Sequence, residues 1–344
     1  MIKKIVCTLL TGIILTTSLS DIYANEKFTL EHVNGSNAHI LKSINEKAFK
    51  KSDEAIIINE NASIDAISAT PLAYLKDAPI ITTPWLKMSK DNIDYIKKLG
   101  VKKITIVGGL KNVSKTIEVN LADMGIEVDR IYGQDRYDTS MKIVEAINKE
   151  KKVSKVILMS SLSGLENSIS VADFACKNNM PIIWANDNQI ETTAEFVNKQ
   201  NYEKVYVVGN DEKFGNNVAQ HINNIEPIKE INKYDTNVEY IKELYDDVDS
   251  IYTVNIEYGN NSDITKYLSL PVAAAKQNIP ILVCNKNFSY SQEEFIKENI
   301  ETVIEVGDEV GNYDILNTFK SSEFLKAMII VAVVIIILVR GFKA

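Results

Sequence analysis

Residues 77–85 read DAPIITTPW, residues 179–187 read NMPIIWAND, and residues 278–286 read NIPILVCNK. Each stretch places a proline before an apolar run, and the three prolines stand roughly 100 positions apart, a regular interval of the kind that indicates internal repeats. Proline has no N–H to donate, so it suits the first position of a β-strand, where it also ends the preceding helix. The tripled stretch therefore predicts three copies of one structural unit.

Apolar runs also flank the proline-led stretch in each copy. One run precedes it, as AIIIN from Ala55, KVILMS from Lys155 and SIYTVN from Ser250, and another follows it, as KITIVGG from Lys103, KVYVVGN from Lys204 and TVIEVGD from Thr302. Short apolar strands that alternate with helical spacing pair in parallel through right-handed crossovers. Each copy is therefore predicted to be a small α/β unit with helices covering its sheet.

Capping residues mark the helices expected in the first copy. Asp65, or Ser63 just before it, can cap the first helix, and Ser89 can cap the second by accepting bonds from free backbone N–H groups. Gly100 and Gly125 stand where helices of this copy are expected to end.

The two ends of the chain have the pattern of export and membrane segments. Residues 1–24 contain two lysines, an apolar run and small residues up to Ala24, which predicts a secretory signal peptide cleaved after Ala24, with Ser20 as a competing site. Residues 324–339 contain one charge, Lys326, which predicts a transmembrane helix over residues 323–340 with a cytoplasmic tail at 341–344. The alternatives are a buried N-terminal helix and a β-rich core segment.

Charge and cysteine content limit the classes of partner. The chain carries 38 Lys and Arg against 46 Asp and Glu, a net charge of −8, and residues 25–322 alone carry about −11. Such a body is not expected to bind nucleic acid, and it repels a polyanion at long range unless basic residues cluster or cations bridge. Beyond the leader, Cys176 and Cys284 are too few for a disulfide scaffold, so two buried thiols are expected, with one bridge between them as the alternative.

The stretch RIYGQDRYDTSMKIVEAI, residues 130–147, follows the first copy. It contains a strand end, a glycine turn at Gly133, a capping Asp135, and a helix with apolar residues on one side. Reduced versions open the other copies, as HVNGSNAHILKSI from His32 and EINKYDTNVEYI from Glu230. The same junction thus introduces each of the three units.

These residues resemble the type-2 cell wall binding repeats of surface proteins from clostridia and related Gram-positive bacteria. The family's signature of arginine, glycine, aspartate, arginine-tyrosine and threonine matches Arg130, Gly133, Asp135, Arg136, Tyr137 and Thr139. SIDAISATPLAYL from Ser63 is similar to the family's DALSA segment, and the proline-led strands are similar to its PILLT strand. The resemblance implies three tandem Toprim-like or flavodoxin-like parallel-sheet units in a pseudo-threefold arrangement, at residues 25–129, 130–229 and 230–322.

The resemblance also implies a function, which is non-covalent anchoring to the cell wall through an anionic polymer. The family's PILLT strand is implicated in binding, and the positions that match it are Pro79, Ile80, Ile81, Thr82, Pro181, Ile182, Ile183, Trp184, Pro280, Ile281, Leu282 and Val283. Trp184 and Val283 replace the expected leucine. Arg130 and Arg136 are further candidates, with pairing to a carboxylate such as Asp135 or Asp138 as the structural alternative.

The carboxyl ends of the parallel strands are the expected place for a polyanion, because helix N-termini and their free N–H groups gather there. Lysines near these ends could add positive charge or be ordinary solvated residues; they are Lys87, Lys111, Lys213 and Lys286. Trp85 and Trp184 could stack on sugar rings or pack in the core. Three weak sites on one rigid body would lengthen the residence time of the protein on the wall, which favours an anchoring function over a catalytic one.

No catalytic constellation is found in the sequence. A Toprim-like phosphodiesterase needs a glutamate after its first strand and an aspartate pair after a later one, and Glu60 could supply only the first. The three histidines form no metal-type pair, and a P-loop and a nucleophile elbow are missing. We therefore expect a non-enzymatic cell-surface protein without cofactor or metal, a monomer with an internal pseudo-trimer, held to the plasma membrane by its C-terminal helix. The alternative is an extracellular solute-binding or sensory ectodomain.

Overall fold

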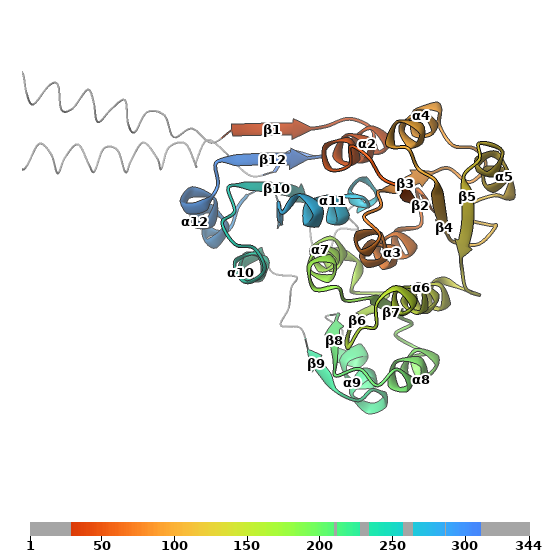
Figure 1. Ribbon diagram of the computed structural model, residues 1–344. Helices are drawn as coiled ribbons and strands as arrows, with labels where there is room; N and C mark the ends of the chain where they lie inside the picture. The colour runs from red at the N-terminus through yellow and green to blue at the C-terminus, as the bar shows by residue number, and fades with distance from the viewer. Residues whose placement is uncertain (1–28, 210–211, 228–233, 257–263, 286, 311–344) are drawn as a thin grey trace, which may run out of the picture.

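The structure, a computed structural model, describes residues 29–209, 212–227, 234–256, 264–285 and 287–310 (Figure 1). Its described strands form three parallel four-stranded sheets, which confirms the expected α/β architecture. In the first unit, consecutive strand residues such as Ile56, Ile57 and Ile58 are buried. Both faces of the sheet are therefore covered, as an unbroken run of β-branched residues predicts.

The helices and strands of the three units follow one order. The first unit contains α2 (Asn37–Ala48), β2 (Glu54–Asn59), α3 (Ser63–Leu75), β3 (Ile80–Thr83), α4 (Lys90–Leu99), β4 (Lys103–Val107), α5 (Lys115–Asp123) and β5 (Glu127–Ile131). The second contains α6 (Arg136–Glu150), β6 (Lys155–Ser160), η1 (Leu165–Asn167), α7 (Ser168–Asn178), β7 (Ile182–Ala185), α8 (Glu191–Lys199), β8 (Lys204–Val208), α9 (Glu212–His221) and β9 (Ile225–Pro227). The third contains α10 (Tyr234–Leu244), β10 (Ser250–Asn255), η2 (Ile264–Tyr267), α11 (Leu270–Gln277), β11 (Ile281–Cys284), α12 (Tyr290–Asn299) and β12 (Thr302–Val306).

The three sheets share one strand order. The first sheet runs β3-β2-β4-β5 and the second runs β7-β6-β8-β9, which is the order of a flavodoxin-like sheet shortened to four strands. The strand β5 straddles the expected boundary between residues 129 and 130, because it pairs with β4 and then leads directly into α6. The signature stretch therefore ends one sheet and starts the next unit.

The third sheet is completed by the first described strand of the chain, β1 (Thr29–Val33). β1 pairs in parallel with β12, and Figure 1 shows the two lying side by side. The Thr29 N–H donates to the Glu301 carbonyl at 2.7 Å, and the Gly307 N–H donates to the Val33 carbonyl at 3.0 Å. β1 thus takes the place that β5 and β9 take in the other sheets, and it joins both ends of the described chain in one unit.

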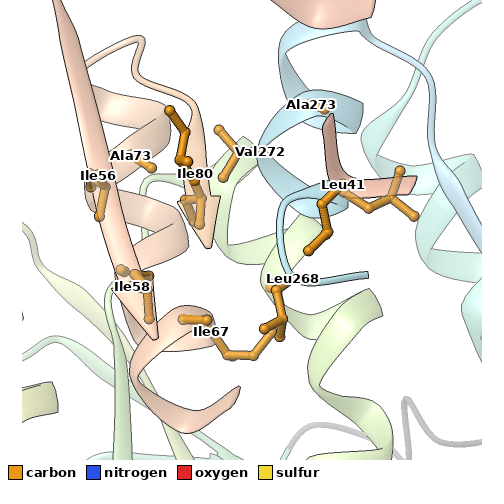
Figure 2. Close-up of a cluster of buried hydrophobic side chains, with 14 of the residues drawn as sticks. Leu41, Ile56, Ile58, Ile67, Ala73, Ile80, Leu268, Val272 and Ala273 are labelled. Carbon is orange, nitrogen blue, oxygen red and sulfur yellow. The ribbon is translucent and has the colours of Figure 1, made fainter. Parts of the chain in front are cut away.

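A continuous hydrophobic core joins the three units. The helices α3, α7 and α11 contact one another, and each comes from a different unit. Figure 2 shows Ile56, Ile67 and Ile80 of the first unit facing Leu268 and Val272 of the third within one buried cluster. Because apolar burial is the main favourable term in folding, this shared cluster makes the units one packed body rather than separate domains on a string.

The central helices end in the same way. Asp77, Asn179 and Asn278 take left-handed backbone conformations, with φ of +49°, +51° and +58°, and each precedes a proline-led strand. Lys177 Nζ of the second unit donates to Asn278 Oδ1 of the third at 2.7 Å, and Lys276 of the third forms an ion pair with Asp77 of the first. The repeated turn thus also carries polar contacts between units.

Buried amides hold the proline-led strands, which lie at one edge of each sheet. Asn45 Nδ2 of α2 donates to the Ile80 carbonyl at 2.7 Å. Asn237 of α10 makes the equivalent contact in the third unit, where its amide donates to the Ile281 carbonyl at 3.1 Å and accepts the Val283 N–H at 2.8 Å. These side chains supply partners that a neighbouring strand would otherwise supply.

Asn45→Ala is expected to lower the free energy of unfolding by about 1–3 kcal/mol, because the buried Ile80 carbonyl loses this donor. Urea denaturation followed by circular dichroism measures the change. The control is Asn61→Ala, an exposed residue in the loop after β2, for which a change within about 0.5 kcal/mol is expected. Equal effects of the two substitutions would contradict a structural role for the buried amide.

Several sequence expectations concern the ends of helices and the ends of the chain. Ser89 caps α4 by accepting the Asn92 N–H at 3.1 Å, as predicted. The capping prediction for Asp65 and Ser63 is wrong, because α3 begins at Ser63 without a side-chain cap and Asp65 is buried in its first turn. The predicted signal peptide at 1–24, transmembrane helix at 323–340 and tail at 341–344 lie outside the described residues. Within the described ranges, no helix combines the length and the apolar character needed to cross a bilayer.

Candidate functional site

The loops that follow the strands form the carboxyl edge of each sheet. In the first unit these loops follow β3, β4 and β5, and they comprise residues 84–89, 108–114 and 132–135. Trp85 Nε1 donates to the Leu110 carbonyl at 2.9 Å, and the Ser114 N–H donates to the Trp85 carbonyl at 2.9 Å. Nδ2 of Asn59, the last residue of β2, donates to the Asn112 carbonyl at 2.7 Å. Hydrogen bonds thus join the loops after β3 and β4 to each other and to the end of β2.

Four large apolar side chains are exposed on this surface, and we call them the first-unit patch. They are Trp85, Leu86, Leu110 and Tyr132, with exposed fractions of 51–57%. Tyr132 lies against the chain at Gly109, where an added Cβ would stand 3.7 Å from its Cδ2 atom. Since Gly109 precedes Leu110, the ring of Tyr132 and the ring of Trp85 flank the same loop.

The twelve strand positions that match the PILLT segment are all buried. They are Pro79, Ile80, Ile81, Thr82, Pro181, Ile182, Ile183, Trp184, Pro280, Ile281, Leu282 and Val283. Trp184 is fully buried, and its Nε1 has no hydrogen-bond partner in the described part of the chain. In this arrangement the strands fix where the following loops begin, and the loops are what a large polymer can reach.

The two candidate arginines have different surroundings. Arg130 in β5 is almost buried; its Nε and Nη2 donate to Glu118 Oε2 at 3.2 and 3.0 Å, and its Nη1 donates to the Gly108 carbonyl at 2.7 Å. Arg130 therefore ties α5 to the loop after β4, and its carboxylate partner is Glu118 rather than Asp135 or Asp138. Arg136, the first residue of α6, is exposed.

Arg136, the first residue of α6 in the second unit, also acts electrostatically on the edge of the first unit. Its positive charge acts on Asp65, a buried carboxylate in the first turn of α3. Burial raises the pKa of Asp65 to about 6, although a hydrogen bond from Asn112 Nδ2 at 3.1 Å and the Arg136 charge both oppose the rise. The carboxyl group of Asp65 thus lies beneath the loop after β4, at the point where the units meet.

The remaining signature residues build the junction at the start of α6. Asp135 caps this helix by accepting the N–H groups of Tyr137 and Asp138, each at 2.9 Å. The Gly133 N–H donates to Thr139 Oγ1 at 3.0 Å, and a Cβ at Gly133 would stand 2.5 Å from the Thr139 backbone nitrogen. Only glycine fits this close approach, so the signature has a structural explanation that is independent of ligand binding.

The second unit has a polar carboxyl edge. Asp187, in the loop after β7, is buried and accepts Ser160 Oγ–H at 2.5 Å and the N–H groups of Ser161 and Leu162 at 3.0 and 3.3 Å. Tyr137 Oη–H donates to Ser161 Oγ at 3.1 Å, so the signature helix also holds this loop. Leu162 is the large apolar side chain exposed here.

The third unit has a charged edge. His32 Nδ1 of β1 lies 2.8 Å from Oε1 of Glu305, a buried carboxylate of β12, and Lys266 pairs with Asp308 after β12. Lys266 stands where the first unit has Asp65, since both lie fourteen residues before the repeated proline. The three edges therefore share a backbone plan and differ in chemistry.

Sequence reasoning found the location of these edges but missed part of their chemistry. It singled out Trp85 but not Leu86, Leu110 or Tyr132, although all four directly follow predicted strands. It also missed Asp187, for which the only sequence signal is its place in a polar NDN stretch after a buried strand. Of the lysines proposed there, Lys87 and Lys111 are exposed, Lys213 donates to Asn188 Oδ1 at 2.9 Å, and Lys286 lies outside the described residues.

The fold and these edges define a class of protein: a repeat protein of three α/β units that presents three loop surfaces from one rigid core. The chain belongs to the cell wall binding domain 2 (CWB2) family, because the family model matches residues 33–118 and 130–219. These two ranges fall on the first and second units. Family membership makes cell wall binding the class of function that this fold supports.

Individual relatives agree with this family. The chain is 27% identical to the N-acetylmuramoyl-L-alanine amidase LytC of Bacillus subtilis (strain 168) over 284 residues, which cover 81% of this chain and 55% of the amidase. It is similar in fold to Cwp8 from Clostridium difficile, with a TM-score of 0.71, 24% identity and coverage of 91% of this chain and 54% of Cwp8. Cwp6 from Clostridium difficile gives a TM-score of 0.69 and 23% identity, with coverage of 83% and 46%. The chain thus spans about half the length of the relatives it matches.

Proposed function

We propose that the protein binds the bacterial cell wall non-covalently, as a binding scaffold rather than an enzyme, by holding an anionic wall polymer at its carboxyl edges. The observation that carries this proposal is the family match to two units, joined to a third unit with the same strand order. The units of the scaffold would comprise residues 34–131, residues 132–227, and residues 234–310 together with 29–33.

The polymer would contact loops rather than strands, because the proline-led strands are buried. Backbone N–H groups at helix starts and exposed cations such as Arg136 can hold anionic groups there. Since the chain as a whole is negative, the attraction has to be local or bridged by cations. Weak contacts at several edges of one rigid body would raise the overall avidity for the wall above the affinity of a single edge. The gain can reach about 10²–10⁴-fold, because the second and third contacts form at a high effective concentration.

The proposal also includes the location of the protein in the cell envelope. An exported chain whose residues 323–340 cross the plasma membrane would join that membrane to the wall. Its role would be a staple between the two layers of the envelope.

The test is a pull-down of the full-length chain, in mild detergent, with purified Gram-positive cell walls before and after chemical removal of their anionic polymers. We expect the chain to sediment with intact walls and the bound fraction to fall at least about tenfold after removal, because the polyanion supplies the salt-dependent attraction.

Raising the salt concentration serves as the internal control, since screening weakens contacts with a polyanion. Undiminished binding to polymer-free walls would exclude the polymer as the partner, and absence of binding to intact walls would exclude the function. A small molecule that copurifies in a one-to-one ratio would favour a solute-binding ectodomain instead.

A further inference from the structure

We infer that the first-unit patch is a stacking platform for the sugar rings of a wall polysaccharide, and that it sets this unit apart from the second. The inference rests on the proposed function and names the chemistry of one of its edges. A sugar ring has an apolar C–H face and a rim of hydroxyl groups, so it fits a surface of exposed aromatic rings set among polar groups.

The platform is rigid before any ligand binds. The Trp85 ring is fixed at its Nε1 by the Leu110 carbonyl, while the backbone of Trp85 is fixed by the Ser114 N–H. Ser114 Oγ–H also donates to the Leu86 carbonyl at 3.3 Å. Because both loops are held by these bonds, little side-chain or loop entropy remains to be lost on binding.

Exposed cations adjoin the platform residues in the sequence. Lys87 follows Leu86, Lys111 follows Leu110, and both are exposed; among the described residues neither forms an ion pair. The exposed Arg136 lies four residues after Tyr132. By contrast, Arg130 and Lys115 are paired with Glu118, so their charge is already offset. The chemistry that fits is therefore a glycan that also carries anionic groups.

The second unit lacks this platform. The position equivalent to Trp85, six residues after the repeated proline, is Asp187, whose carboxylate is buried and bonded to the loop after β6. The tryptophan of the second unit, Trp184, lies within β7 and is fully buried. Sugar stacking is thus expected at the carboxyl edge of the first unit, whereas the edge of the second unit presents polar groups at the equivalent position.

Two tryptophans with opposite exposure allow a direct test on the full-length chain. Trp85 is 51% exposed and Trp184 is 0% exposed, so a neutral quencher such as acrylamide reaches Trp85 alone. The probe is the soluble anionic polysaccharide released from Gram-positive walls by mild acid, with uncharged dextran as a second probe. We expect the wall polysaccharide to reduce the quenching constant at least about twofold, because a stacked sugar covers one face of the ring.

Substitutions then measure how much the Trp85 ring contributes to the affinity for the polysaccharide. Trp85→Ala is expected to weaken polysaccharide binding about tenfold, and Trp85→Phe, which keeps an aromatic face, about two- to threefold. Val119→Ala is the control and is expected to leave binding unchanged, because Val119 is an exposed apolar residue of α5 that lies outside the loops of the carboxyl edges. Thermal unfolding of each variant confirms that the fold is intact.

The outcomes separate the two proposals. If the wild type sediments with walls but the polysaccharide neither protects Trp85 nor discriminates Trp85→Ala from Val119→Ala, the stacking platform is excluded and wall binding stands. If dextran protects Trp85 as well as the wall polysaccharide does, the platform binds sugar rings whether or not they carry anionic groups. That result would exclude a role of the flanking cations in binding. If the wild type does not bind walls at all, the proposed function fails first.

Discussion

Deletion of strand β1 is expected to destabilise the opposite end of the described chain. β12 would lose one of its two parallel partners, the strand Thr29–Val33, and the buried Glu305 carboxylate would lose His32. Lost ladder hydrogen bonds at about 1 kcal/mol each, and the exposure of Val33 and its neighbours, predict a loss of at least about 3 kcal/mol in the third unit. Hydrogen exchange should then accelerate about 100-fold or more in β10 and β12, since each 1.4 kcal/mol is about tenfold.

The comparison needs two chains that differ only in this strand. A chain that starts at Lys27 keeps β1, and one that starts at Asn34 lacks it. We expect β2 and β4 to exchange at similar rates in both chains, because the first sheet contains no residue of β1. Equal protection of β12 in the two chains would show that the third sheet is complete without β1.

Asp173→Asn is expected to remove a large pH dependence of stability. Asp173 lies in α7, where Tyr245 Oη–H donates to its Oδ1 at 2.6 Å and the Ile281 backbone also hydrogen-bonds to it. Burial raises the pKa of Asp173 from 3.8 to about 7, although these bonds and the charge of Lys177 oppose the rise. The other titratable groups at this seam are Cys176 and Tyr74, and burial raises the pKa of each.

The sign of the effect follows from proton binding. Below the unfolded pKa of 3.8 both states hold the proton; between there and pH 7 only the folded state holds it, so the folded state loses stability as the pH rises. The wild type should therefore lose about 4 kcal/mol relative to Asp173→Asn between pH 4 and pH 8. Urea denaturation of both chains across this range gives the difference directly.

A second carboxylate provides the control for this experiment. Asp65, with its pKa raised to about 6 by burial, should produce a smaller difference between wild type and Asp65→Asn, and that difference should be complete about one pH unit earlier. Parallel pH profiles for wild type and Asp173→Asn would mean that the pKa of Asp173 is the same in the folded and unfolded chain, so that burial does not raise it.

Some features of the site could be predicted from the sequence and others could not. The proline-led runs and the signature at Gly133 and Asp135 are local patterns, and the structure places them at strand starts and at a helix start as expected. The partner of Arg130 was not predictable, because Glu118 lies in helix α5 while Arg130 lies in strand β5, and only tertiary packing brings the two side chains to 3.0 Å. Exposure was not predictable either, since Trp85 and Trp184 occur in closely matching stretches but have opposite surroundings.

The sequence by itself determined that this protein is made of three α/β units, because proline position, apolar runs and helical spacing are properties of short segments that each unit repeats. Only the tertiary structure decided that Thr29 pairs with Thr302, that the candidate binding strands are buried, and that four apolar side chains share one exposed surface. The physical reason is that burial and pairing depend on residues up to 273 positions apart, and no local pattern records which distant segment covers a given side chain.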